Sequence, residues 1–138
     1  MLTGIAMATQ ATVNSKLADF VSSPIAAAFI SFAVGTIVLF VLMLVTGVPL
    51  GSLALSKNAP WIAWIGGFLG AFFVVVMATV VPRIGVALAF SSAIGGQLLV
   101  ALAIDHFGWL DVPEKPINLW RILGAALVLG GVILIRKF

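Results

Sequence analysis

The sequence predicts an all-α integral membrane protein with five transmembrane helices that pack through small residues. Hydrophobic residues make up 63% of the 138 residues and charged residues only 8%, whereas a soluble domain has roughly 45–50% apolar and about 25% charged residues. The mean hydropathy of +1.31 agrees with a chain that is mostly transmembrane. Long segments lack charge and contain small residues at helical spacing. The length predicts a single transmembrane domain, residues 1–138.

The first expected span, residues 2–18, is also the most polar. At 100° per residue, Thr3, Gln10 and Asn14 fall within a narrow stripe of the helix. Within a bilayer such side chains face protein, water or a solute rather than lipid. A secretory signal peptide is the alternative interpretation, but no basic segment precedes the apolar residues, and the two amides interrupt them.

The second expected span covers residues 24–45 and carries no charge. It begins at Ser22-Ser23-Pro24, because a hydroxyl at the cap and proline in the first turn are typical of a helix start. Ala27, Ser31 and Gly35 recur every four residues and form a small-residue ridge that allows another helix to approach closely. Ser31 therefore either packs within this ridge or lines a cavity.

The third expected span covers residues 61–81 and follows a helix-breaking loop. Trp61 and Trp64 open it, as interfacial tryptophans often do. Trp64 lies a turn deeper and either anchors the helix or faces a cavity. Gly66 and Gly70 have the spacing of a close helix–helix contact.

The fourth expected span, residues 86–104, has two polar features. Ser92 belongs to a small-residue face that also contains Gly85, Ala89 and Gly96. Gln97 lies on a different face, about 140° from Ser92. Its amide either forms an interhelical hydrogen bond or lines a cavity.

The fifth expected span covers residues 119–135 and is rich in glycine and alanine. The loop before it, residues 105–118, holds three of the four acidic residues and the only histidine, as expected for an aqueous connection. Trp109 provides an aromatic anchor, and Asn118 is positioned to cap the last helix.

The basic residues give almost no instruction on orientation. With the N-terminus outside, the inner side holds four of them (Lys16, Arg83, Arg136 and Lys137), and the outer side holds three (Lys57, Lys115 and Arg121). Cytoplasmic loops normally carry a clear excess. The near balance allows a weak N-out preference, insertion in both directions, or orientation by other chains or lipids. Insertion in both directions predicts an antiparallel homodimer, in which each chain is half of an inverted ten-helix assembly.

Enzymatic chemistry is not expected. No cysteine is present, the single His106 has no nucleophile paired with it, and no metal-ligand spacing or phosphate-binding loop occurs. His106 and Asp105 either relay protons or form a solvated loop pair. The sequence therefore predicts no enzyme activity, no cofactor and no metal. Because the basic residues form no patch, nucleic acid is not expected as a partner.

A solute site must therefore rely on neutral groups, because no charged residue is central in any span. The predicted substrate-lining residues are Gln10, Asn14, Ser31, Trp64, Ser92 and Gln97. Such groups suit a neutral or zwitterionic polar solute, or an anion met by helix N-termini. Asp19 and Asp105, at the ends of spans, are the candidates for coupling to an ion.

Several motifs carry a family resemblance along nearly the whole chain. They are Gln10-Ala11, Val13-Asn14-Ser15, Ser23-Pro24, Ser31-Phe32, Gly35-Thr36, Gly96-Gln97-Leu98-Leu99 and Ile104-Asp105-His106-Phe107-Gly108-Trp109. In this combination the chain resembles the YdcZ-type family of small bacterial inner-membrane proteins, within the drug/metabolite transporter superfamily. The resemblance implies a multi-pass half-transporter of five spans that works as a homodimer or with a sister copy. It also implies a longer lead before Gln10 than the nine residues present here.

Together these features favour a secondary transporter subunit. It would move a small polar metabolite or toxic compound across the cytoplasmic membrane by alternating access. Two alternatives share the same architecture, namely a dual-topology channel and a non-transporting assembly or accessory protein. In the last case the polar stripe of the first helix would serve only to hold helices together.

Overall fold

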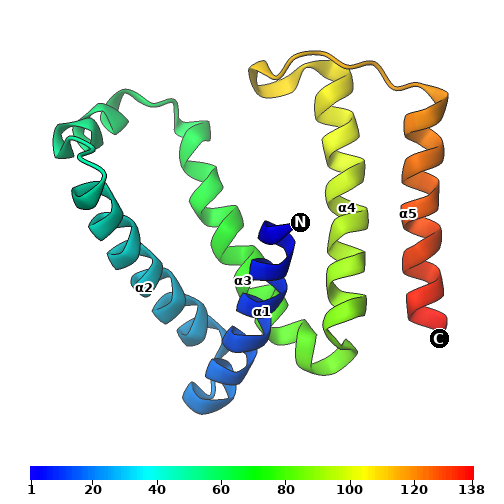
Figure 1. The fold of residues 1–138 in the computed structure, drawn as a ribbon, viewed down its shortest axis with the longest axis horizontal. Coiled ribbons are helices and arrows are strands. Elements are labelled where there is room, and N and C mark those ends of the chain that lie inside the picture. Colours follow the sequence, from blue (N-terminus) through cyan, green and yellow to red (C-terminus); the bar gives the residue numbers. More distant parts are fainter. The chain divides into compact units, whose positions relative to one another are not determined.

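The computed structural model describes residues 1–138, and all its regular elements are helical (Figure 1). The α-helices are α1 (Leu2–Val21), α2 (Pro24–Val45), α3 (Ile65–Ile84), α4 (Val86–Phe107) and α5 (Leu119–Lys137). The connections contain the 3-10 helices η1 (Leu50–Asn58), η2 (Trp61–Trp64) and η3 (Trp109–Asp111). The all-α prediction is confirmed. The chain forms two compact units, Met1–Arg83 and Ile84–Phe138, which are described in turn. The single transmembrane domain stays a prediction.

Four helical segments are long and apolar enough to cross a membrane. They are Pro24–Val45, Trp61–Ile84, Val86–Phe107 and Leu119–Lys137. Only 6% to 22% of their most apolar windows is buried within the chain, so their outer surfaces suit contact with lipid or with other protein. Helix α1 is not among the four, because its polar residues lower its hydropathy. The fifth transmembrane span therefore stays a prediction.

The helix bounds differ modestly from those expected. Helices α1 and α4 continue past residues 18 and 104 to Val21 and Phe107. The third α-helix begins at Ile65 rather than at residue 61, because the preceding tryptophan-rich turn is a 3-10 helix.

Helix α3 also continues through Pro82 to Ile84, past the expected end of the span at residue 81. Proline lacks the N–H that would complete one hydrogen bond of the last turn, and the helix tolerates this loss near its end. The connection to α4 is thereby reduced to Gly85, whose φ of 82° is accessible to glycine without steric cost.

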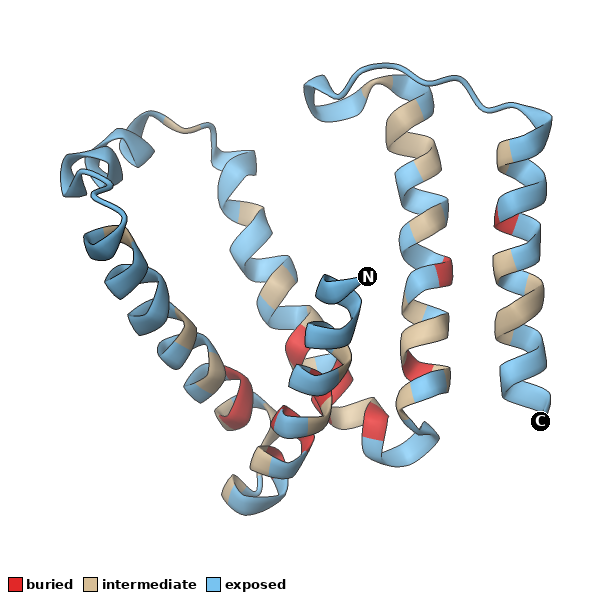
Figure 2. Cartoon of the chain, viewed as in Figure 1, coloured by how far each residue is buried: buried red, intermediate tan, exposed pale blue.

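In the first unit, α1 and α2 meet at a sharp reversal. Ser22 has a left-handed φ of 52°, and Ser23 caps α2 by accepting a hydrogen bond from the Ala26 amide at 3.2 Å. Figure 2 shows the buried residues of both helices near this junction. Ala27 and Ala28 are almost fully buried, which permits a close approach of the two backbones.

Helix α3 of the same unit has a buried stripe at Val74, Met77, Ala78 and Val81, the spacing of one helix face. Further along, the Phe32 ring of α2 lies against Gly70, where an added Cβ would be 3.6 Å from the ring. No atom lies within 4 Å of an added Cβ at Gly66, so the close helix–helix contact expected from the spacing of Gly66 and Gly70 stays a prediction.

In the second unit, α4 and α5 run side by side as an antiparallel hairpin (Figure 1). The two helices pack closely at Gly95, where an added Cβ would be 3.2 Å from Leu129 Cδ2. Of the predicted small-residue face, Ala89 is buried but Ser92 and Gly96 are exposed. The contact with α5 is therefore made by Gly95, which lies next to the predicted face, and packing of the face that contains Ser92 and Gly96 stays a prediction.

Candidate functional site

A cavity of about 210 Å³ lies between α1 and α2 in the first unit. We call it the α1–α2 groove, and it is lined by Gln10, Ser31, Phe32, Gly35, Thr36 and Leu39. The small residues of the α2 ridge create the space, since Ser31 and Gly35 project little beyond the backbone. The structure therefore places Gln10 and Ser31, two of the predicted substrate-lining residues, at one cavity, and their role toward a solute stays a prediction.

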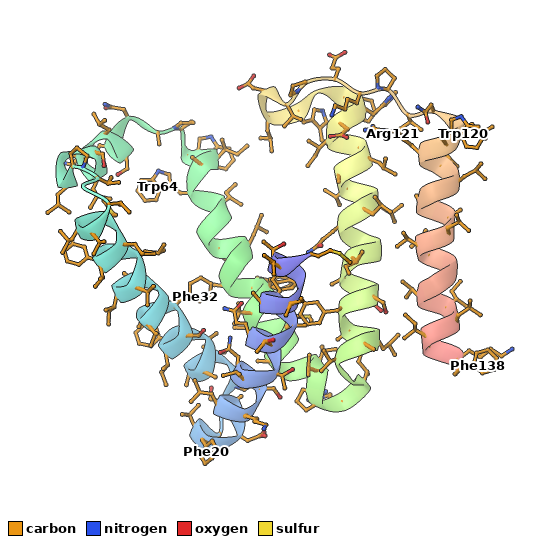
Figure 3. All side chains as sticks on the ribbon, viewed as in Figure 1. Phe20, Phe32, Trp64, Trp120, Arg121 and Phe138 are labelled. Atoms are coloured by element: carbon orange, nitrogen blue, oxygen red, sulfur yellow. The ribbon has the colours of Figure 1, made fainter.

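Sequence reasoning did not single out Thr36 as a lining residue. Its Oγ1 donates a hydrogen bond to the Phe32 carbonyl at 2.8 Å and keeps its lone pairs for a further donor. Figure 3 shows Phe32 directed from α2 toward α3. The groove thus combines one amide and two hydroxyls with apolar walls. The sequence contains a feature that could have predicted this role, because Thr36 directly follows Gly35 of the small-residue ridge.

Asn14 lies one turn beyond Gln10 on α1 and is almost completely buried, with 4% of its surface exposed. Its Nδ2 donor has no hydrogen-bond partner within the chain. A buried amide donor without an acceptor costs about 1–3 kcal/mol. An acceptor from a second chain, a water molecule or a solute would recover this free energy. Asn14 is therefore the buried polar side chain of the first unit that still requires a hydrogen-bond partner.

A second cavity of the first unit, of about 400 Å³, lies where the end of α1, the start of α2 and the end of α3 meet. We call it the junction pocket. Its polar lining residues are Asp19, Ser22, Ser23, Thr79 and Arg83. It therefore contains a carboxylate and a guanidinium, and no ion pair joins them. Asp19 is a predicted coupling residue, whereas sequence reasoning did not assign Arg83 to a site.

Asp105, the other predicted coupling residue, is bound within the second unit. Its carboxylate pairs with Arg121 Nη2 at 3.0 Å, and Arg121 Nη1 donates to the Lys115 carbonyl at 2.8 Å. The Lys115 amide in turn donates to the Asp105 carbonyl at 2.7 Å. Figure 3 shows Arg121 directed from α5 toward α4. We call this closed set of contacts the hairpin clasp, because it joins α4, the loop and α5.

An apolar cavity of about 410 Å³ lies between α4 and α5 next to the clasp. Its lining includes Leu98, Leu102, Asp105, Arg121, Gly124 and Val128. Both charged groups at its edge are already engaged with each other. This cavity offers apolar contact but no free polar group.

The remaining predicted site residues, Trp64, Ser92 and Gln97, are not among the residues that line the two cavities of the first unit. Trp64 is 62% exposed within η2. Ser92 and Gln97 are exposed on α4, in the second unit. Their role as substrate-lining residues stays a prediction.

The residues offer no arrangement for metal binding, since no group of three or more His, Cys, Asp and Glu side chains lies close together. His106 Nδ1 accepts a hydrogen bond from the Ile117 amide at 3.3 Å. The histidine therefore takes part in ordering the loop between α4 and α5.

The sequence comparisons define the family. Residues 1–134 match the family model described as "Putative inner membrane exporter, YdcZ". No curated protein and no solved structure shows a significant match to the chain. The family match and the four apolar helices make this a multi-pass protein of the inner membrane. The chain belongs to the YdcZ family of inner-membrane exporters.

Proposed function

We propose that the chain is a subunit of a secondary exporter that moves a small polar solute across the inner membrane by alternating access. The single observation that supports this most is the α1–α2 groove, in which Gln10, Ser31 and Thr36 line a cavity whose other walls are apolar. Polar groups at membrane depth are costly and therefore usually serve a function. The proposal involves no enzymatic step and no cofactor.

The working form that we propose is a homodimer. In this proposal α1 is the fifth span, and two inverted copies surround a central solute path. The near-even distribution of basic residues and the buried, unpaired Asn14 donor both support it. A second copy, or a sister half-transporter, would cover part of the apolar surface that each chain leaves exposed.

The site is tested by solute transport in proteoliposomes containing the purified chain and a panel of small polar metabolites. Gln10→Ala should lower the transport rate about three- to tenfold, the equivalent of one lost hydrogen bond. Thr9→Ala is the matched control, because Thr9 is the neighbouring polar residue and lies outside the groove. Saturable transport that is unchanged in both Gln10→Ala and Asn14→Ala would contradict the site. Currents far above transporter turnover would indicate a channel instead.

The antiparallel arrangement is tested separately. A reporter fused after Phe138 should signal on both sides of the membrane. Two lysines inserted into the segment Leu50–Asn58 should shift the signal to one side, because the existing charge bias is small. A signal on one side only, before any insertion, would exclude the antiparallel homodimer.

A further inference from the structure

The junction pocket differs from the α1–α2 groove in its charge. It holds one acidic and one basic side chain, Asp19 from the last turn of α1 and Arg83 from the last turn of α3. Both are exposed, and neither forms an ion pair or a side-chain hydrogen bond within the chain. The structure thus leaves two opposite charges available in one cavity.

The backbone holds Asp19 at the edge of the pocket. The Ser22 amide donates to the Asp19 carbonyl at 3.4 Å, and the Ser23 amide donates to the Ala18 carbonyl at 3.0 Å, which closes the end of α1. Ser23 is occupied as the cap of α2, whereas the Ser22 hydroxyl remains available to a ligand. The pocket therefore presents a carboxylate, a guanidinium and a hydroxyl on ordered helix ends.

A ligand with a single charge would gain little in this pocket. Asp19 would repel an anion and Arg83 would repel a cation, whereas a molecule with both charges would attract both residues. A guanidinium can bind a carboxylate or phosphate through two parallel hydrogen bonds. The cavity of about 400 Å³ falls within the range of about 300–1,000 Å³ usual for small-molecule sites.

We propose that the junction pocket binds a small zwitterionic group, with its ammonium at Asp19 and its acidic group at Arg83. Two sources carry this chemistry, a free amino-carboxylate solute and the head group of phosphatidylethanolamine. If the ligand is a free solute, the pocket is where the exporter first holds it, and this step rests on the proposed function. Binding itself does not depend on transport.

The test for a free solute is the thermal unfolding of the purified full chain in lipid-free detergent. L-leucine and 5-aminopentanoate are the probes, since they separate the two charges by different lengths. Leucinamide, which keeps only the ammonium, and N-acetyl-leucine, which keeps only the carboxylate, are the controls. At least one zwitterion should raise the unfolding temperature with a saturable concentration dependence, and neither control should do so. An equal rise with the single-charge analogues would overturn the proposal.

Variants connect the response to the two residues. Asp19→Asn and Arg83→Gln should each abolish the shift while unfolding like the parent chain without ligand, because both side chains are exposed and unpaired. The exchanged double variant Asp19→Arg/Arg83→Asp should retain a zwitterion response. It keeps the net charge at this end of the unit, since both positions line one pocket. A shift that persists in both single variants would overturn the assignment.

The lipid source is tested in nanodiscs of phosphatidylglycerol with and without phosphatidylethanolamine. If the head group is the ligand, phosphatidylethanolamine should stabilise the parent chain but neither single variant, and the soluble zwitterions should have no effect in detergent. Absence of stabilisation by both sources would overturn the proposal. Zwitterion binding without transport in proteoliposomes would contradict the proposed function alone. Transport of another solute without zwitterion binding would contradict this inference alone.

Discussion

Each compact unit contains an aspartate and an arginine at the ends of neighbouring helices, but the two pairs are arranged differently. In the second unit, Asp105 and Arg121 are 3.0 Å apart, and the Lys115 backbone completes the hairpin clasp. In the first unit, Asp19 and Arg83 line one pocket without pairing. Residue types alone do not distinguish the two pairs.

The comparison shows that a charged residue at a helix end can have either of two roles. The clasp uses its charges to join two helices and a loop, so these charges contribute to stability. The junction pocket leaves its charges free, so they contribute little to stability and can respond to a ligand. On this basis Asp105, a predicted coupling residue, is better explained as a structural residue. Asp19 remains a candidate for coupling to an ion or for binding a ligand.

The largest expected effect concerns helix packing in the second unit. Gly95→Leu should lower the free energy of unfolding by about 2–3 kcal/mol, because the added side chain would overlap Leu129. Gly96→Leu is the matched control and should change it by less than about 0.5 kcal/mol, since no atom lies within 4 Å of an added Cβ. Denaturant unfolding in mixed micelles would measure both. Equal losses would show that α4 and α5 do not pack at Gly95.

The next effect separates the two acid–base pairs directly. Arg121→Gln should lower the free energy of unfolding by about 1.5 kcal/mol, because it removes a partly buried charged hydrogen bond. Arg83→Gln should change it by less than about 0.5 kcal/mol, since Arg83 has no partner in the chain. The same unfolding measurement compares the two variants. The distinction between a closed and an open pair would fail if Arg83→Gln were the more destabilising change.

A smaller effect should be common to both units. Asn118→Ala and Ser23→Ala each remove a helix cap, at α5 and α2, and each should cost about 1 kcal/mol. Asn118→Asp and Ser23→Thr retain a capping oxygen and are the controls. Thermal unfolding would check this pair. Similar losses of unfolding free energy in the two variants would show that the units differ in how their charges are paired but not in how strongly their helix caps stabilise them. Unequal losses would show that the helix caps differ as well.

The smallest effect on stability is expected at the buried amide of the first unit. Asn14→Leu should change the free energy of unfolding of the purified chain by no more than about 0.5 kcal/mol, because the gain from removing the unpaired Nδ2 donor is offset by the poorer fit of the branched leucine side chain at this buried position. Transport should nevertheless fall if Asn14 serves the solute path. Unfolding and proteoliposome transport would be measured on the same preparation. A loss above about 2 kcal/mol would mean that the Nδ2 donor has a partner in the assembled protein.

Most of the fold could be predicted from the sequence. Charge-free segments bounded by Ser23-Pro24 and by Asn118 predict helix starts, because capping depends on residues next to each other in the chain. The ends of the helices were predicted less accurately than their starts. The third span, expected to end at residue 81, continues through Pro82 and Arg83, because proline is tolerated in the last turn when the helix can end just after it.

The candidate site could be predicted only in part. Gln10 and Ser31 share a groove, as their polarity within apolar helices suggests. The pairing of Asp105 with Arg121, sixteen positions away, depends on how the loop folds back over α4. Adjacent glycines give another example, since only the contact with Leu129 distinguishes Gly95 from Gly96.

The sequence by itself determined that this is a helical membrane protein, where its helices lie along the chain, and which few polar groups its spans carry. These properties follow from composition and local spacing, because hydrocarbon accepts only long apolar segments with satisfied backbones. Only the tertiary structure decided which charges are engaged and which are free. Asp19 and Asp105 look alike in the sequence. In the structure, Asp105 is paired with Arg121 from another helix, whereas Asp19 has no partner within the chain.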